Sequence, residues 1–430
     1  MKDMSRSLFL LLAVSCSILF SCSPDDPSRN DPQADIKTMV VEGNGWHIEL
    51  KSESQNTFLG NNFIRPVELR YMNNAFYETY FTQMINFNEM DVFRKIENGK
   101  VAMYDYPRQG VGLTYRLAWR IRNGFCFLPN ETSEYEYDDQ GGGYRMFKDG
   151  VLLYSFPQGN EVSPESEIYT YSVNYNLKRS INLNPYNFIA TVLDIPTGKI
   201  TRFKGSGVGG DIGMNNGSYV WDEQVTQIAP DNFKIYYGSV VSYGGYQMKL
   251  NVAELSNVNM TIVGDPHTTG HYLIDQPQSN VFLSSLQGIG YNYGDSQVNG
   301  FNKGDKVYFM VKLVLMPDFI RLYEYDKTTK EITLAKGWTA GSLPAALTTM
   351  SYSKIYFRPV HNDMIIVGGT QLFKIDLATF AITEISPVFA SGAEGFTLCQ
   401  VGERIYGTVS QMKTYSADEK NFIANLFYYE

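Results

Sequence analysis

The amino-acid sequence predicts an all-β protein, and three observations lead to this fold class. The 430 residues include 31 Tyr, 26 Phe and 37 Gly, a composition that favours strands and turns over helices. Short apolar or alternating runs, such as residues 354–359, 364–367 and 372–375, are separated by turn residues. Beyond residue 21 the sequence has no sustained helical period and no apolar segment as long as a membrane span.

Residues 1–21 have the pattern of a lipoprotein signal peptide. Lys2 and Arg6 give a positive start, and an apolar run of signal-peptide length leads to Ser21 and Cys22. A small residue directly before a cysteine resembles a bacterial lipobox, which implies that Cys22 is lipidated and becomes the mature N-terminus. Acyl chains on Cys22 would hold the protein at a lipid bilayer. The alternative is an ordinary secretory leader.

Residues 22–36 are polar, acidic and proline-rich, which is typical of an extended tether. The acidic run directly after the cysteine resembles the surface-export signal of Bacteroidota lipoproteins. This resemblance implies an outer-membrane lipoprotein exposed at the cell surface, and an anchor that faces the periplasm is the alternative. Residues 37–430 remain for one folded domain.

A recurring hairpin unit is the strongest signal within residues 37–430. Its intact copies place Asp at the end of a strand, Thr three residues later, and Ile three residues after that. An Asp in this place can accept hydrogen bonds from backbone N–H groups two or three residues on. The unit occurs at residues 194–201, 326–333 and 376–383, with a decayed copy at 254–261. Each copy predicts a strand–turn–strand hairpin.

Turns near residues 45, 99 and 150 continue the same pattern without the Asp. One turn position per copy gives 45, 99, 150, 198, 258, 330 and 380, a mean spacing of about 56 residues. Periods of about 40 to 50 residues in an all-β chain are typical of β-propeller blades, which bury their faces against one another. We therefore predict a β-propeller of seven blades. Six or eight blades, a pair of β-sandwiches and a β-helix are the alternatives.

Two resemblances accompany this pattern. Residues 365–379 resemble a kelch or related propeller strand pair, with Ile382 in the place of the kelch tryptophan. The order of lipobox, acidic tether and irregular blades resembles that of Bacteroidota surface-exposed β-propeller lipoproteins, one branch of which captures ferric siderophores beside a TonB-dependent transporter. The resemblance implies capture of a small ligand and its transfer to such a transporter.

The charge balance argues against nucleic acid as a partner. Lys2, Asp3 and Arg6 leave with the leader, so that 34 basic and 44 acidic side chains remain and the net charge is −10. Binding to phosphates requires clustered Lys and Arg instead.

Three arginines form the first candidate binding feature. Arg116, Arg120 and Arg122 lie at even spacing within residues 115–122, so in a strand they would share one face. Guanidinium groups in such a row suit carboxylate or catecholate groups. The alternative is pairing with the acidic residues at 134–139.

Aromatic residues in glycine-rich segments form the second candidate, because their rings can stack on a sugar or an aryl group. They are Tyr219, Trp221, Tyr243, Tyr246, Tyr291 and Tyr293. The alternative is that these rings only cover blade edges.

Two histidines and two cysteines complete the candidate residues. His267 and His271 lie in an expected loop and are candidate metal ligands, with two exposed histidines as the alternative. Cys126 and Cys399 remain in a compartment that permits disulfides. They form either a disulfide or two separate thiols.

Motifs for catalysis and cofactors give little support to an enzyme. Residues 205–210 match the letters of a dinucleotide fingerprint, but another loop follows where that fingerprint needs a helix, and we expect no cofactor. The sequence lacks the G-x-S-x-G and HExxH motifs. We expect non-catalytic capture of a metallophore, a haem-like compound or an oligosaccharide. A propeller glycoside hydrolase or lyase and a protein-binding or adhesion module are the alternatives.

Overall fold

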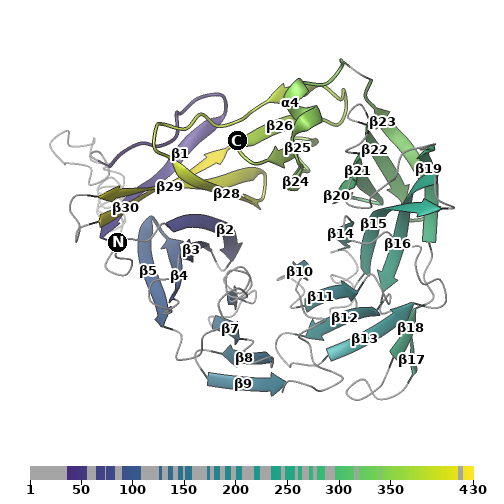
Figure 1. The fold of residues 1–430 in the computed structure, drawn as a ribbon, viewed down its shortest axis with the longest axis horizontal. Helices are drawn as coiled ribbons and strands as arrows, with labels where there is room; N and C mark the ends of the chain where they lie inside the picture. The colour runs from purple at the N-terminus through teal and green to yellow at the C-terminus, as the bar shows by residue number, and fades with distance from the viewer. Residues whose placement is uncertain are drawn as a thin grey trace, which may run out of the picture. The chain divides into compact units, whose positions relative to one another are not determined.

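In the described residues of a computed structural model the chain is almost entirely β-strand, with one short helix, α4 (Ala345–Thr349) (Figure 1). The described residues are 36–55, 64–72, 74–82, 90–107, 125–127, 134–138, 144–148, 151–156, 172–174, 179–184, 189–194, 200–205, 217–222, 234–243, 247–256, 260–263, 271–274, 278–285, 296–313, 316, 319–339, 341–414 and 420–430. Thr38–Glu430 form one compact unit. Among the described residues no helix has the length and apolar character to cross a membrane.

The described strands form seven sheets, which we call blades 1 to 7 in chain order. Blade 1 contains β2 (Ile64–Met72), β3 (Ala75–Thr82), β4 (Met90–Glu97) and β5 (Lys100–Pro107). Blade 2 contains β6 (Phe125–Phe127), β7 (Glu134–Asp138), β8 (Tyr144–Lys148) and β9 (Val151–Phe156). Blade 3 contains β10 (Ser172–Asn174), β11 (Arg179–Asn184), β12 (Ile189–Asp194) and β13 (Ile200–Gly205), extended by β17 (Met260–Val263) and β18 (His271–Ile274).

In blades 4 to 7 each strand pairs antiparallel with the strands next to it in its sheet. Blade 4 contains β14 (Ser218–Trp221), β15 (Lys234–Tyr243), β16 (Gln247–Ser256) and β19 (Gln278–Ser285). Blade 5 contains β20 (Ser296–Lys303), β21 (Lys306–Leu313), β22 (Ile320–Asp326) and β23 (Ile332–Gly337). Blade 6 contains β24 (Lys354–Arg358), β25 (Asp363–Gly368), β26 (Gln371–Asp376) and β27 (Ile382–Glu384). Blade 7 contains β28 (Glu394–Val401), β29 (Arg404–Thr414), β30 (Lys420–Tyr429) and β1 (Trp46–Gln55).

Blade 7 is built from strands near both ends of the chain. β1 pairs antiparallel with β30, with Trp46 opposite Tyr429, and the backbone N–H of Glu430 donates to the Gly45 carbonyl at 3.1 Å. Seven sheets in chain order, the last completed by a strand from the other end of the chain, form the topology of a seven-bladed β-propeller. The predicted fold class and blade number are therefore confirmed.

The Asp turns of blades 5 and 6 have the predicted geometry. Asp326 Oδ1 accepts from the backbone N–H groups of Thr328 and Thr329, each at 2.8 Å. Asp376 Oδ1 makes the equivalent bonds to the second and third residues after it, at 2.8 and 2.7 Å. These backbone N–H groups hold the pKa of both carboxyl groups below the ordinary value of 3.8. In blade 1, Asn98 and Gly99 both have positive φ and join β4 to β5 in a two-residue turn.

The decayed copy at 254–261 does not form a hairpin, and this prediction was wrong. β16 pairs with β15 and β19, whereas β17 pairs with β18 in blade 3. The physical reason lies in Glu254, whose carboxylate forms an ion pair with Lys234 of its own blade and a second one with Lys330 across the interface to blade 5. It is therefore not free to accept bonds from turn amides.

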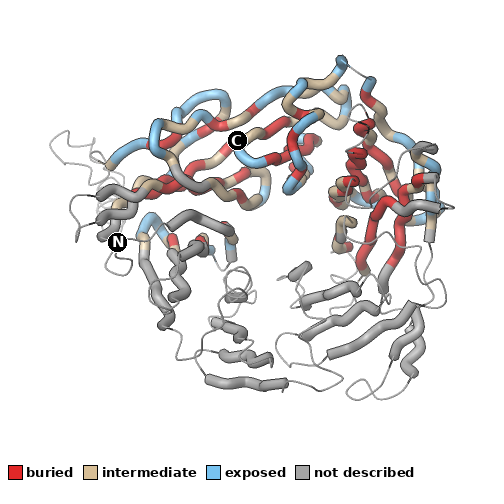
Figure 2. The backbone as a smooth tube through the Cα atoms, in the orientation of Figure 1, coloured by how far each residue is buried: buried red, intermediate tan, exposed pale blue. Residues whose placement is uncertain are grey.

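Many residues of the described strands are buried, as the red segments of the tube in Figure 2 show, and their apolar side chains join neighbouring blades. One cluster joins blades 4 and 5 and includes Leu250 and Phe309, and a second joins blades 5 and 6. The approach of blades 4 and 5 is close, because a Cβ added at Gly238 would lie 2.3 Å from Phe309 Cε1. In the part of the chain whose side chains the structure describes, blades 4, 5 and 6 thus bury apolar faces against one another.

Candidate functional site

Most of the residues singled out in the sequence lie outside the described residues. They are Cys22, Arg116, Arg120, Arg122, Tyr246, His267, Tyr291 and Tyr293. Lipidation of Cys22 and the binding roles of the others stay predictions.

Tyr219 and Trp221 lie on β14, the first strand of blade 4, where we had expected a flexible segment. The alternating side chains Val220 and Asp222 are buried against blade 5, which fixes this segment as a strand. Trp221 is partly buried as a result.

Two further candidates also lie on strands. Tyr243 is the last residue of β15, and His271 begins β18, where it pairs with Val263 and does not lie in the expected loop. In the part of the chain that the structure describes, no group of three or more His, Cys, Asp or Glu side chains is arranged to hold a metal ion.

The two cysteines lie on different blades. Cys126 is on β6 of blade 2, and Cys399 is on β28 of blade 7. The disulfide between them stays a prediction.

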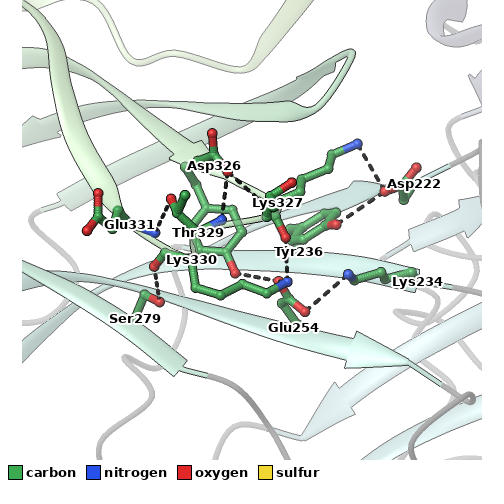
Figure 3. A network of polar contacts seen from close by, with 12 residues as sticks. Asp222, Lys234, Tyr236, Glu254, Ser279, Asp326, Lys327, Thr329, Lys330 and Glu331 are labelled. Carbon is green, nitrogen blue, oxygen red and sulfur yellow. Dashed lines mark hydrogen bonds and ion pairs between the residues drawn. The ribbon is translucent and has the colours of Figure 1, made fainter.

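A polar network fills one part of the interface between blades 4 and 5 (Figure 3). Glu254 on β16 is only 5% exposed, and its carboxylate pairs with Lys234 Nζ at 3.1 Å and with Lys330 Nζ. It also accepts the hydroxyl of Tyr325. Burial alone would raise the pKa of Glu254, but the bonds from Lys330 and Tyr325 and the charge of Lys234 hold it below the ordinary 4.5. The buried carboxylate is therefore ionised.

Asp222 is the second acidic centre of this network. Its Oδ2 pairs with Lys327 Nζ at 3.0 Å and accepts the Tyr236 hydroxyl at 3.2 Å. The Nζ atoms of Lys234 and Lys327 lie 5.0 and 5.5 Å from the centroid of the Tyr236 ring. Burial, and then the charge of Asp222, raise the pKa of the Tyr236 phenol, which stays protonated.

The network ties the Asp turn of blade 5 to blade 4. Lys327 and Lys330 both belong to that turn, and Lys330 has a φ of 65°. Since both buried carboxylates already have a cation and a tyrosine hydroxyl as partners, we assign this network to the stability of the interface.

A row of five ring side chains crosses the interface between blades 7 and 1. We call it the aromatic row, and its members in order are Tyr71, Phe76, Tyr406, Tyr428 and His47. Successive ring centroids lie 4.8, 4.7, 5.6 and 5.3 Å apart. The two end members are exposed, Tyr71 to 39%, and the three middle rings are partly exposed.

The strand register builds most of this row. Tyr71 stands opposite Phe76 on blade 1, and Tyr428 stands opposite both Tyr406 and His47 on blade 7. Residues directly opposite each other in antiparallel strands project from the same face. The contact between Phe76 and Tyr406 then joins the two blades.

Buried side chains support the row from below. Phe76 and Tyr406 pack against a core cluster formed by Leu50, Leu69, Ile96 and Leu426. Deeper in the same interface, the hydroxyl of Thr408 donates to the buried carboxylate of Glu78. The middle of the row therefore rests on fixed strands, as a binding surface requires.

An exposed ion pair stands at one end of the row. The Arg404 guanidinium lies 4.4 Å from the centroid of the Tyr428 ring, and its Nε donates to Glu430 Oε1 at 3.1 Å. The bonds to Glu430 and Tyr406 raise the pKa of Arg404, and the bond from Arg404 holds the pKa of Glu430 below 4.5. The two side chains are 41% and 53% exposed.

This arrangement is suited to recognition of a ring-shaped ligand. Aromatic rings offer flat apolar surface, while tyrosine hydroxyls, a guanidinium and a carboxylate beside them supply donors and acceptors. Of the surfaces that the structure describes, the aromatic row is our candidate binding site.

The aromatic row was not among the features predicted from the sequence. Its members come from β1, β2, β3, β29 and β30, and strand pairing and blade contact bring them together. A local signal does exist, because Tyr71 and Phe76 flank the turn at Asn74, which has a φ of 61°. Aromatic residues beside turns are too common in this chain for that signal to single them out.

No protein-family model matches the sequence, and no curated protein matches it. Among solved structures, the chain is similar to the β-propeller domain of Cps50 (Swd1) from Myceliophteria thermophila, at 8% identity and a TM-score of 0.37, covering 86% of this chain and 99% of that one. It is also similar to a chain of the mitotic checkpoint complex, at 8% identity and a TM-score of 0.40, covering 90% and 98%.

A third similar structure is a puromycin-hydrolyzing peptidase of Mycobacterium tuberculosis, at 10% identity and a TM-score of 0.39, covering 83% of this chain and 52% of that one. The low identities and TM-scores give no argument about ligand or activity. The assignment of the fold rests on the strand order of the seven blades.

Proposed function

We propose that this protein is a non-catalytic surface lipoprotein that captures a small ligand and passes it to a TonB-dependent outer-membrane transporter. The ligand is a metallophore, a haem-like compound or an oligosaccharide. The seven-bladed propeller is compatible with a module that binds a ligand or a protein. Of these two kinds of partner, we propose a small molecule.

The observation that carries the proposal is the aromatic row. Five rings in contact form a continuous strip from Tyr71 to His47, and both ends are exposed. Exposed rings on a rigid base are costly for solubility and favourable for stacking. A capture function explains why the strip is left open to solvent.

The proposed location, a lipid-anchored protein at the cell surface, is inferred from the first 36 residues. The signal peptide and Cys22 support acylation, and the acidic residues after Cys22 support export to the surface. Labelled palmitate should be incorporated into the wild-type chain and not into Cys22→Ser. Protease added to intact cells should degrade the wild-type chain, and degradation only after lysis would overturn the surface location.

A binding screen tests the capture function itself. The full chain carrying Cys22→Ser, and therefore not acylated, is titrated with ferric siderophores, haem and a glycan array. We expect saturable binding of one of these classes, with no turnover of the bound compound. Absence of binding to all three classes, or hydrolysis of a glycan, would overturn the proposal.

A further inference from the structure

The length of the aromatic row limits the kind of ligand that can use it. Each step between ring centroids measures 4.7 to 5.6 Å, and four such steps connect the first ring to the last. A compact chelate or a single planar ring would cover only part of this strip. An extended molecule made of repeated rings would contact all of it.

The polar groups along the row are mixed in charge and rich in hydroxyls. Tyr71 contributes a hydroxyl that lies 3.5 Å from Asn74 Oδ1, and Tyr406 and Tyr428 carry two more. The exposed Arg404 and Glu430 supply both a donor and an acceptor at one end. Such a mixture suits the hydroxyl groups of a sugar, which both donate and accept.

The surrounding charges disfavour an anionic ligand at this place. Among the described residues, the guanidinium that contacts the row, that of Arg404, is already paired with Glu430. The whole chain carries a net charge of −9. An anion would have to displace Glu430 from Arg404, whereas a neutral ligand does not meet this obstacle.

From these observations we propose that the aromatic row binds an uncharged linear oligosaccharide. Its sugar rings lie along the strip from Tyr71 to His47, and its hydroxyls bond to Arg404 and Glu430 at one end. This inference rests on the proposed capture function and names the ligand class of that function. The ligand proposed for the row is uncharged, whereas Arg116, Arg120 and Arg122 would favour an anionic chelate.

Calorimetric titration of the Cys22→Ser chain tests this assignment. The probes are neutral glucose, xylose and mannose hexasaccharides in their common linkages, with an oligogalacturonate of equal length and a ferric catecholate as comparisons. We expect saturable binding of a neutral hexasaccharide, weaker binding of its disaccharide, and no binding of the oligogalacturonate. Tyr71→Ala and His47→Ala should each weaken affinity roughly three- to tenfold.

Phe282→Ala provides the matched control. Phe282 is an aromatic residue that is 53% exposed on β19 of blade 4, away from the row, and its removal should leave affinity unchanged. Equal losses in Phe282→Ala and Tyr71→Ala would overturn the assignment to the row. Binding of the ferric catecholate alone would overturn the oligosaccharide and leave the capture function standing, whereas binding of none of these probes, together with no binding of haem in the screen, would overturn both.

Discussion

Two interfaces between neighbouring blades of the propeller are built from different kinds of side chain. Between blades 4 and 5, the carboxylates of Asp222 and Glu254 are buried and fully engaged by lysines and tyrosines of the same network. Between blades 7 and 1, the outer part of the interface is a strip of rings that ends in exposed side chains, Tyr71 and His47.

We assign a role in stability to the interface between blades 4 and 5, and a role in ligand recognition to the interface between blades 7 and 1. A buried ion pair is sensitive to the loss of one partner, because the remaining charge stays in a place with little water. An exposed ring has little to lose in the folded protein, and the part of it that is open to solvent is available to a ligand. We therefore expect substitutions in the first interface to change stability, and substitutions in the second to change binding.

The largest effect is expected for Glu254→Gln. The amide keeps the shape of the side chain but leaves Lys234 and Lys330 without their counter-charge, at a cost of about 3 kcal/mol in the free energy of unfolding. Denaturant titration at neutral pH measures this loss. The control is Glu324→Gln, whose ion pair with Lys306 lies at a more exposed position and should cost less than about 1 kcal/mol. Equal costs in the two variants would contradict the comparison.

A smaller loss is expected for Phe76→Ala in the other interface. Phe76 is half-buried, touches the rings of Tyr71 and Tyr406, and packs on the core cluster below the row. Truncation should cost about 2 kcal/mol, less than a fully buried phenylalanine would. Thermal and denaturant unfolding provide the measurement, with Phe282→Ala as the exposed control. A cost near zero would mean that the row is not packed as described.

Acidification should reduce the difference between the wild type and Glu254→Gln. The pKa of Glu254 is lower in the folded protein than its ordinary 4.5, so its contribution is complete above that pH and is lost as the pH falls through the folded-state pKa. Below the folded-state pKa, the side chain of Glu254 in the wild type is protonated and resembles the amide of the variant. The difference in the free energy of unfolding between the two chains should therefore narrow as titrations are taken from about pH 7 to pH values below the ordinary pKa of a glutamate. A constant difference would show that the charge of Glu254 contributes nothing.

The smallest effect on stability is expected for Glu430→Gln. Its ion pair with Arg404 is exposed, so the melting temperature should stay within error of the wild type. Affinity for the oligosaccharide should nevertheless fall, because the amide is a weaker acceptor than the carboxylate. Parallel melting and calorimetric titrations separate the two quantities. A marked drop in melting temperature would place this pair with the structural network instead.

The sequence predicted those features that local chemistry decides. Asp326 and Asp376 cap their turns through backbone groups two and three residues away, and Asn98 with Gly99 forms its turn from two neighbouring residues. The recurrence of such turns along the chain predicted seven blades, although the copy at 254–261 does not form a hairpin.

Features that depend on distant partners could not be predicted in this way. Glu254 has the position of a turn carboxylate in the sequence, but its partner Lys330 lies 76 residues away on the next blade. The aromatic row joins strands β1, β2, β3, β29 and β30, which meet because β1 completes blade 7 and blade 7 packs against blade 1. Sequence spacing carries no information about such contacts before the register of the closing strand is known.

Hydroxyl-radical footprinting tests most directly whether the aromatic row is the ligand surface. The Cys22→Ser chain is labelled with and without a saturating amount of the ligand that the binding screen identifies, and protection is quantified at every tyrosine. We predict protection at Tyr71, Tyr406 and Tyr428. Protection confined to Tyr243, Tyr246, Tyr291 or Tyr293, with the row labelled as in the free protein, would contradict the account.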